Sequence, residues 1–212
     1  MTPHRSYLAL FFALAIFGLT ADQATKYGMF RWLYGKPGHE SEVVPGWFRF
    51  TAQFDSDVPT SSMAFHKSLQ TWSAPVMPHV NKGALFGLGG DHKDLANGIF
   101  AAISFGAGIA IVVWATRKNV ACDGWLISAL GLILGGAIGN CYDRVVFHGV
   151  RDFLYFYWFE FPVFNVADCC LVVGTTMLLL QALFGKGHTV VPTQAISQTT
   201  ERLSENCYWR KP

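Results

Sequence analysis

The chain has 212 residues, of which 51% are hydrophobic and only 14% are charged, and its mean hydropathy is +0.29. An ordinary soluble domain carries about 25% charged residues. The net charge of +2 is too small for a surface that neutralises nucleic-acid phosphates. The composition therefore argues against a nucleic-acid-binding protein, and so hydrophobic a chain is not a disordered one.

The charged residues are unevenly distributed. Four stretches lack Asp, Glu, Lys and Arg altogether: residues 6–21, 95–116, 124–142 and 169–185. A helix needs about 17–25 apolar residues to cross a bilayer. We therefore predict four transmembrane helices, at about residues 6–24, 95–116, 124–142 and 163–184. The expected fold class is an all-α membrane protein with a small extracytoplasmic subdomain of β-structure and loops.

Basic residues in short loops predict the orientation of these helices. Arg5 precedes the first span, Arg117 and Lys118 fill the turn between the second and third, and Lys186 follows the fourth. Cytoplasmic loops are enriched in Lys and Arg. Both termini are therefore expected in the cytoplasm, with the long segment 25–94 on the opposite side.

The segment 25–94 combines two kinds of sequence. Residues 41–53 are rich in Val, Trp and Phe around a Pro-Gly pair, which predicts short β-structure. Residues 54–80 are polar and interrupted by prolines, which predicts a long loop with one short helical piece near residues 62–72. We expect residues 1–186 to form a four-helix membrane domain and residues 187–212 a polar cytoplasmic tail.

Polar side chains gather where the four predicted spans meet the outer face. The sequence there contains an acid, an amide or both in each block: Asp22-Gln23-Ala24-Thr25-Lys26, Asn81-Lys82-Gly83-Ala84, Gly139-Asn140-Cys141-Tyr142-Asp143-Arg144 and Phe164-Asn165-Val166-Ala167-Asp168. An ionised carboxylate inside a membrane costs free energy unless it is paired, hydrated or protonated. An acidic residue at such a depth is therefore a candidate for a functional role.

Two carboxylates facing each other at a membrane boundary suit an aspartic hydrolase, because like charges at short range cannot both ionise easily. The residue pattern alone favours Asp168 with either Asp143 or Asp152. Asp168 has another interpretation, since Asn165-x-x-Asp168 resembles a capping box at a helix start. Asp22 similarly suits a capping or anchoring role.

Arg144 also has another interpretation, as an anchor whose long side chain reaches the lipid phosphates.

Other classes of protein fit the same pattern less well. A non-catalytic transporter or scaffold could use the acidic cluster as an ion relay, but a relay needs polar groups through the membrane, and these lie at one face. The seven histidines lie outside the spans, which disfavours a haem protein, and without a CxxC pair neither a disulfide framework nor a zinc site is indicated.

Five blocks carry a family resemblance: DQATK (22–26), NKGALF (81–86), GGAIGNCYDR (135–144), GVRDF (149–153) and FPVFNVAD (161–168). In this order between four spans, they resemble the lipoprotein signal peptidase (signal peptidase II) family. The resemblance implies an aspartic endopeptidase of the bacterial inner membrane, with its active site at the periplasmic face and no metal or cofactor. Its implied partners are diacylglyceryl-prolipoproteins, cleaved just before the lipidated cysteine, together with membrane lipids and globomycin-type inhibitors.

The resemblance also assigns roles to individual residues. It implies that Asp152 and Asp168 are the catalytic pair. It puts five residues in the substrate or inhibitor site: Asn81, Gly83, Asn140, Arg144 and Asn165. It implies a structural role near the site for Asp22, Lys26 and Asp143.

The chain departs from the family pattern in several places. Lys82, Cys141 and Cys169 stand where other residues are usual. The insertion 54–80 has no counterpart in typical members and precedes the Asn81 block directly. We hypothesise that it enlarges a lid over the substrate. Deleting residues 54–78 tests this hypothesis, and unchanged activity and substrate range would reject it.

Overall fold

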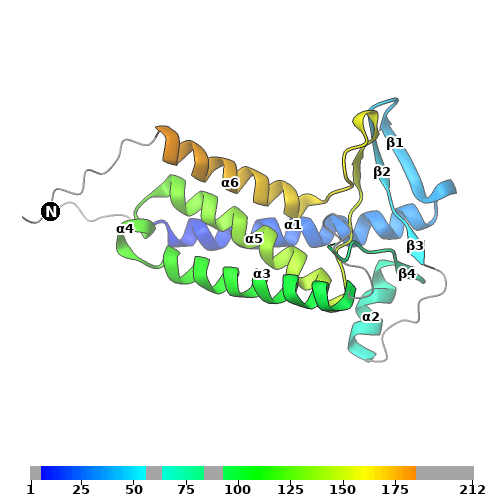
Figure 1. Ribbon diagram of the computed structural model, residues 1–212, viewed down its shortest axis with the longest axis horizontal. Coiled ribbons are helices and arrows are strands. Elements are labelled where there is room, and N and C mark those ends of the chain that lie inside the picture. The colour runs from blue at the N-terminus through cyan, green and yellow to red at the C-terminus, as the bar shows by residue number, and fades with distance from the viewer. Residues whose placement is uncertain (1–5, 56–63, 84–92, 185–212) are drawn as a thin grey trace, which may run out of the picture. The chain divides into compact units, whose positions relative to one another are not determined.

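Four long helices dominate the computed structural model, which describes residues 6–55, 64–83 and 93–184. They are α1 (Leu8–Tyr34), α3 (Lys93–Ala115), α5 (Gly124–Val146) and α6 (Val166–Phe184), and each is long and apolar enough to cross a membrane (Figure 1). The predicted all-α membrane fold with four spans is thereby confirmed. The described residues up to Gln181 belong to one compact unit, which contains the site described below.

Helix α5 contacts α1 on one side and α3 on another, and glycines let it approach its neighbours closely. A Cβ atom on Gly135 would lie 2.8 Å from the carbonyl oxygen of Ala15 in α1. A Cβ atom on Gly136 would lie 2.5 Å from the carbonyl oxygen of Ala167 in α6. Small residues at such positions allow helix backbones to meet in a membrane.

The bundle has a small apolar core and a broad apolar exterior. The core between α1 and α5 includes Phe11, Ala15, Ile127, Leu130 and Leu134. Large side chains on the outer surfaces of the spans are exposed: Ile16, Phe17, Ile103, Phe105, Ile109, Leu179 and Leu183. Exposed apolar surface of this extent is expected where helices face lipid rather than water.

A small three-stranded antiparallel sheet follows α1 and confirms the β-structure expected near residues 41–53. Its strands are β1 (Glu40–Val44), β2 (Phe48–Thr51) and β5 (Leu154–Phe156), in the order β1-β2-β5. The sheet brings residues from either side of the second and third spans together. Three short helical segments complete this description: η1 (Pro37–His39), α4 (Lys118–Ala121) and η4 (Tyr157–Phe159).

The insertion begins and ends in a second, two-stranded sheet. Strand β3 (Phe54–Asp55) pairs with β4 (Met77–Pro78), so the two ends of the insertion lie side by side. Between them lies α2 (Ala64–Ser73), which contacts α1 and α5. This helix matches the short helical piece expected near residues 62–72.

Two helix ends differ from the predicted spans. Helix α1 continues past residue 24 to Tyr34, because Asp22 and Lys26 are buried and paired and so do not end the helix. Helix α6 begins at Val166 rather than residue 163, since Phe164 exchanges backbone hydrogen bonds with Leu154 and is extended. Asp168 consequently lies in the first turn of α6.

Candidate active site

The loop between α5 and β5 is held by an isolated antiparallel bridge. The amide nitrogen of Asn81 donates to the carbonyl oxygen of Val150 at 2.8 Å, and Val150 donates back to Asn81 at 2.9 Å. Gly149 permits this approach, because a Cβ atom there would lie 2.6 Å from a methyl group of Val80. The bridge places the Asn81 side chain beside Asp152.

The half-buried Asp152 carboxylate accepts hydrogen bonds from two asparagine side chains. Its Oδ1 accepts from Nδ2 of Asn165 at 2.6 Å, and its Oδ2 accepts from Nδ2 of Asn81 at 3.2 Å. Burial, and then the negative charge of Asp168, raise the pKa of Asp152 to about 7, against the opposing effects of these hydrogen bonds and of Lys26. A carboxyl group with such a pKa keeps its proton in part of the molecules at neutral pH.

Asp168 lies in the first turn of helix α6 and also faces Asn140. Its Oδ2 accepts from the amide nitrogen of Asn165, and Oδ1 of Asn165 accepts from the amide nitrogen of Asp168, both at 3.1 Å. These reciprocal bonds are the capping arrangement considered from the sequence. Its Oδ1 accepts from Nδ2 of Asn140 at 2.9 Å, so capping leaves one oxygen directed toward the bundle.

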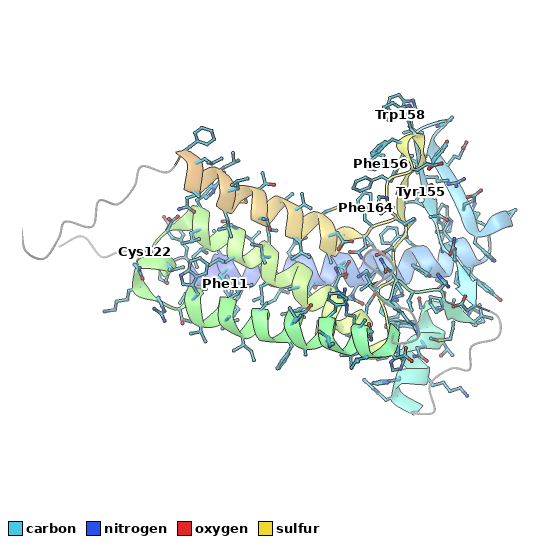
Figure 2. All side chains as sticks on the ribbon, in the orientation of Figure 1. Phe11, Cys122, Tyr155, Phe156, Trp158 and Phe164 are labelled. Atoms are coloured by element: carbon cyan, nitrogen blue, oxygen red, sulfur yellow. The ribbon has the colours of Figure 1, made fainter. Side chains whose placement is uncertain are left out.

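Asn140 and Asn165 connect the two carboxylates. Nδ2 of Asn165 lies 3.2 Å from Oδ1 of Asn140, in addition to its bond to Asp152. Oδ1 of Asn140 also accepts from Nζ of Lys26 at 3.0 Å. A continuous chain of side-chain amides thus runs from Asp152 to Asp168. In Figure 2 the labelled Phe164, which precedes Asn165, lies near Tyr155 and Phe156 of β5.

Behind these amides lies a fully buried group of four charges. Lys26 pairs with Asp22 at 2.9 Å and with Asp143 at 3.3 Å, and Arg151 pairs with Asp143 at 2.8 Å. Oδ1 of Asp22 accepts from the amide nitrogen of Ala167, which joins α1 to the start of α6. Two acids and two bases balance, as buried charges require.

Arg144 and Gly83 both lie beside the ring of Phe100 in α3. The guanidinium carbon of Arg144 lies 5.7 Å from the Phe100 ring centroid, and its Nη1 donates to the carbonyl oxygen of Asn140 at 3.2 Å. Gly83 has a φ of +80°, and a Cβ atom there would lie 2.7 Å from the same ring. Nε of Arg144 is buried and has no hydrogen-bond partner within the described ranges.

The structure therefore brings most sequence-predicted site residues into one network. Its members are Asp22, Lys26, Asn81, Asn140, Asp143, Asp152, Asn165 and Asp168. Arg144 and Gly83 adjoin it, through the Asn140 carbonyl and through a bond from the Gly83 nitrogen to the Asn81 side chain.

Two participants received no role from the sequence pattern: Arg151 and Gln23. Gln23 donates to Asp22 and Asp143 and accepts from Arg151. A charge imbalance in the sequence is the signal that points to Arg151: Asp22 and Asp143, buried beside the single Lys26, require a second cation.

The positions that depart from the family pattern lie around the network. Nζ of Lys82 donates to Asp94 at 2.7 Å, the Cys141 thiol lies 3.6 Å from the carbonyl oxygen of Ala101, and Cys169 is exposed. Among residues whose placement is described, no group of three or more His, Cys, Asp or Glu could hold a metal ion.

Comparison with known proteins gives consistent results. Residues 62–184 match the family model described as signal peptidase (SPase) II. A lipoprotein signal peptidase of Rhodopirellula baltica is 36% identical over 191 residues, covering 82% of this chain and 71% of the relative. That of Pseudomonas syringae pv. tomato is 43% identical over 115 residues, covering 52% of this chain and 66% of the relative.

Solved structures with this fold are described as bacterial membrane enzymes. One, determined by the in meso method at 1.9 Å resolution, superposes with a TM-score of 0.62 at 26% identity, covering 87% of this chain and 99% of the other. Together with the four apolar helices, this likeness identifies a multi-pass membrane protein. The family match spans more than half of the chain and includes the amide network from Asn81 to Asp168. The chain belongs to the signal peptidase II family.

Proposed function

We propose that this peptidase is an aspartic endopeptidase that removes signal peptides from diacylglyceryl-prolipoproteins, with Asp152 and Asp168 as its catalytic carboxylates. The observation that carries the proposal is the pair of acids joined through Asn140 and Asn165. Burial and the charge of Asp168 raise the pKa of Asp152 to about 7, as an acid–base pair requires. The relatives named lipoprotein signal peptidase support the choice of substrate.

The two carboxyl groups would divide the work of peptide hydrolysis. Protonated Asp152 donates a hydrogen bond to the scissile carbonyl oxygen, while ionised Asp168 accepts a proton from the attacking water. Water oxygen bonds to the carbonyl carbon, and the C–N bond then breaks as the proton taken from water passes to the leaving amine. Asn140 and Asn165 hold both carboxylates in place without changing charge themselves.

Arg144 is suited to binding the substrate's polar groups. Its buried Nε, which lacks a partner in the described part of the chain, can donate to a main-chain carbonyl or a lipid oxygen. Asn81 and Gly83 lie on the adjacent segment and would border the peptide. In α5, Val145 follows Arg144 and lines an apolar groove of about 570 Å³ between α3 and α5. That groove is suited to the acyl chains of the substrate.

The orientation follows from the same assignment. With the site at the periplasmic face of a bacterial inner membrane, both termini lie in the cytoplasm, as the distribution of Lys and Arg indicates. Inhibition by globomycin-type compounds is part of the proposal, since such an inhibitor would bind at the site that contains Asp152 and Asp168.

The proposal is tested by cleavage of a lipidated model prolipoprotein by the purified full chain in detergent, with and without globomycin. Asp152→Asn and Asp168→Asn are each expected to lower turnover by at least ~10²–10⁴-fold, because each removes an acid–base group. Glu160→Gln, at an exposed position outside the network, is the matched control. Wild-type turnover by either aspartate variant would reject the catalytic pair.

A further inference from the structure

Helix α2 turns its apolar side chains away from the protein and its polar ones toward it. Gln70 and Ser73, one turn apart, are 1% and 0% exposed. Phe65 and Trp72, on the other side of the helix, are 71% and 64% exposed, with half-buried Leu69 between them. A helix on a water-soluble surface has the reverse arrangement, with its apolar stripe toward the core.

The inner face of α2 is held by hydrogen bonds rather than by apolar packing. Nε2 of Gln70 donates to the carbonyl oxygen of Val146 at 2.6 Å, and Oγ of Ser73 accepts from Nη1 of Arg151 at 3.1 Å. The carbonyl of Val146 belongs to the last turn of α5, where no further helical amide is available to it. Apolar side chains are therefore not required on the inner face, and those on the outer face need another environment.

The contacts of α2 fix its level along the bundle. Val146 is the last residue of a helix long and apolar enough to span the membrane. The ring centroid of Trp72 lies 5.4 Å from that of Tyr27 in α1, and the Tyr27 hydroxyl lies 2.8 Å from that of Tyr142 in α5. Trp and Tyr are enriched where hydrocarbon meets the headgroups. Helix α2 thus lies beside the last turn of α5 and beside Tyr27 of α1, near one end of the bundle, where we expect this boundary (Figure 1).

We propose that the face formed by Phe65, Leu69 and Trp72 docks into the interfacial layer of the membrane, with phospholipid as its occupant. An amphipathic helix binds there by burying its apolar face at the boundary between headgroups and acyl chains. Lys67 is exposed on the side of α2 opposite Phe65, where it remains in water. This anchoring role goes beyond the proposed peptidase activity.

Docking would also fix the site loop relative to the bilayer. Ser73, on the inner face of α2, holds Arg151, and Arg151 immediately precedes Asp152. The insertion thereby connects the lipid surface to the loop that carries one of the proposed catalytic acids, through one hydrogen bond and one peptide bond.

Photo-crosslinking of the full chain tests the occupant. The photoreactive residue p-benzoyl-phenylalanine replaces Phe65, Trp72 or, as the matched control, Lys67, and each protein is reconstituted in vesicles of phosphatidylethanolamine and phosphatidylglycerol. Mass spectrometry after irradiation measures phospholipid adducts on α2. We expect yields at positions 65 and 72 several-fold above that at position 67. Equal yields at all three positions would overturn the proposal.

Two further arms of the experiment separate docking of phospholipid from docking of the prolipoprotein and from non-specific labelling. Lipidated prolipoprotein added before irradiation should leave the adducts at position 65 on phospholipid, and transfer of the adducts to the prolipoprotein would overturn the choice of lipid. Phe65→Asp should lower the adduct yield at position 72 several-fold, whereas Lys67→Asp should leave that yield unchanged. An unchanged yield with Phe65→Asp would also overturn the proposed docking. Adduct formation requires no peptide cleavage, so these results are independent of the proposed activity.

Discussion

Arg144 and Arg151 lie close together in the sequence but in different surroundings. Arg151 is fully buried, with its guanidinium carbon 3.8 Å from the Phe147 ring centroid and its nitrogens bonded to Asp143. The guanidinium of Arg144 donates to the Asn140 carbonyl, and its buried Nε has no partner in the described ranges. The first guanidinium completes an ion group that stabilises the fold, and the second retains a free donor beside the proposed acids.

Replacing each arginine by methionine should separate these roles. Arg151→Met leaves Asp143 buried with Lys26 as its remaining ion-pair partner, and we expect it to lower the free energy of unfolding by about 3–5 kcal/mol. Arg144→Met removes no ion pair, so its loss of stability should be smaller, while its peptidase activity falls. Denaturation in detergent and a cleavage assay measure the two effects. Equal destabilisation by both substitutions would contradict the distinction.

The acid Asp152 should make stability depend on pH near neutrality. Its pKa is raised from 3.8 to about 7 in the folded protein, so folding favours the protonated form. The stability from this group is complete below the pKa of the unfolded chain and is lost as pH rises through about 7. We therefore expect Asp152→Asn, which cannot ionise, to be more stable than wild type at pH 8 by roughly 1–3 kcal/mol, and to lose less stability between pH 5 and pH 8.

Thermal denaturation in detergent across this pH range measures the effect. Glu160→Gln, at an exposed carboxylate, should follow the wild-type pH dependence. Parallel curves for wild type and Asp152→Asn would mean that Asp152 does not titrate near neutral pH in the folded protein.

The inserted helix α2 supports the site loop through Ser73. Its hydroxyl accepts a hydrogen bond from the buried Arg151, and Ser73→Ala leaves that N–H unpaired, at an expected cost of about 1–3 kcal/mol in stability. Thr71 is exposed, and its hydroxyl bonds to the carbonyls of Lys67 and Ser68 in its own helix, so Thr71→Ala should change stability by no more than about 0.5 kcal/mol. Denaturation midpoints of the two variants, measured together, test the role of Ser73, and equal midpoints would exclude it.

The elements that the sequence predicts well are those with a local signal. The four spans follow from the absence of charge, the sheet from Val, Trp and Phe near residues 41–53, and α2 from a short helical pattern between prolines. The continuation of α1 past residue 24 has no such signal, because a lysine such as Lys26 is normally expected to face water. Its burial depends on Asp143 and Asn140 of α5, which are distant in sequence.

The candidate site, too, can be predicted only in part from the sequence. The amide and acid blocks indicate which chain segments converge, but not which acid pairs with which base. Asp143 and Asp152 are equivalent alternatives by residue type alone. In the fold, Asp143 is fully buried between Lys26 and Arg151, while Asp152 is half-buried and accepts hydrogen bonds from the neutral amides of Asn81 and Asn165. The Asn81 amide reaches Asp152 through the bridge between Asn81 and Val150, which has no local sequence signal.

The arrangement of the four helices depends on α5. This helix carries residues of the site and also makes close contacts with the backbones of α1 and α6. Asn140 and Asp143 reach the network from α5 only because the backbones of α1 and α6 lie directly against its glycines. A larger side chain on this surface would move α1 and thereby displace Asp22 and Lys26 from Asp143. Packing in the middle of the bundle is thus coupled to the geometry of the site.

Gly135 and Gly106 allow this coupling to be tested with the same substitution. A Cβ atom on Gly135 would lie 2.8 Å from the Ala15 carbonyl oxygen and 3.2 Å from the Gly18 Cα, and backbone atoms cannot turn aside as a side chain can. Gly135→Ala should therefore cost about 1–3 kcal/mol in stability and lower activity. Gly106 is exposed on α3 with nothing within 4 Å of the added atom, so Gly106→Ala should be neutral or stabilising by up to about 1 kcal/mol. Denaturation and cleavage assays on both variants measure the difference, and equal effects would show that close contact between α1 and α5 does not determine the site.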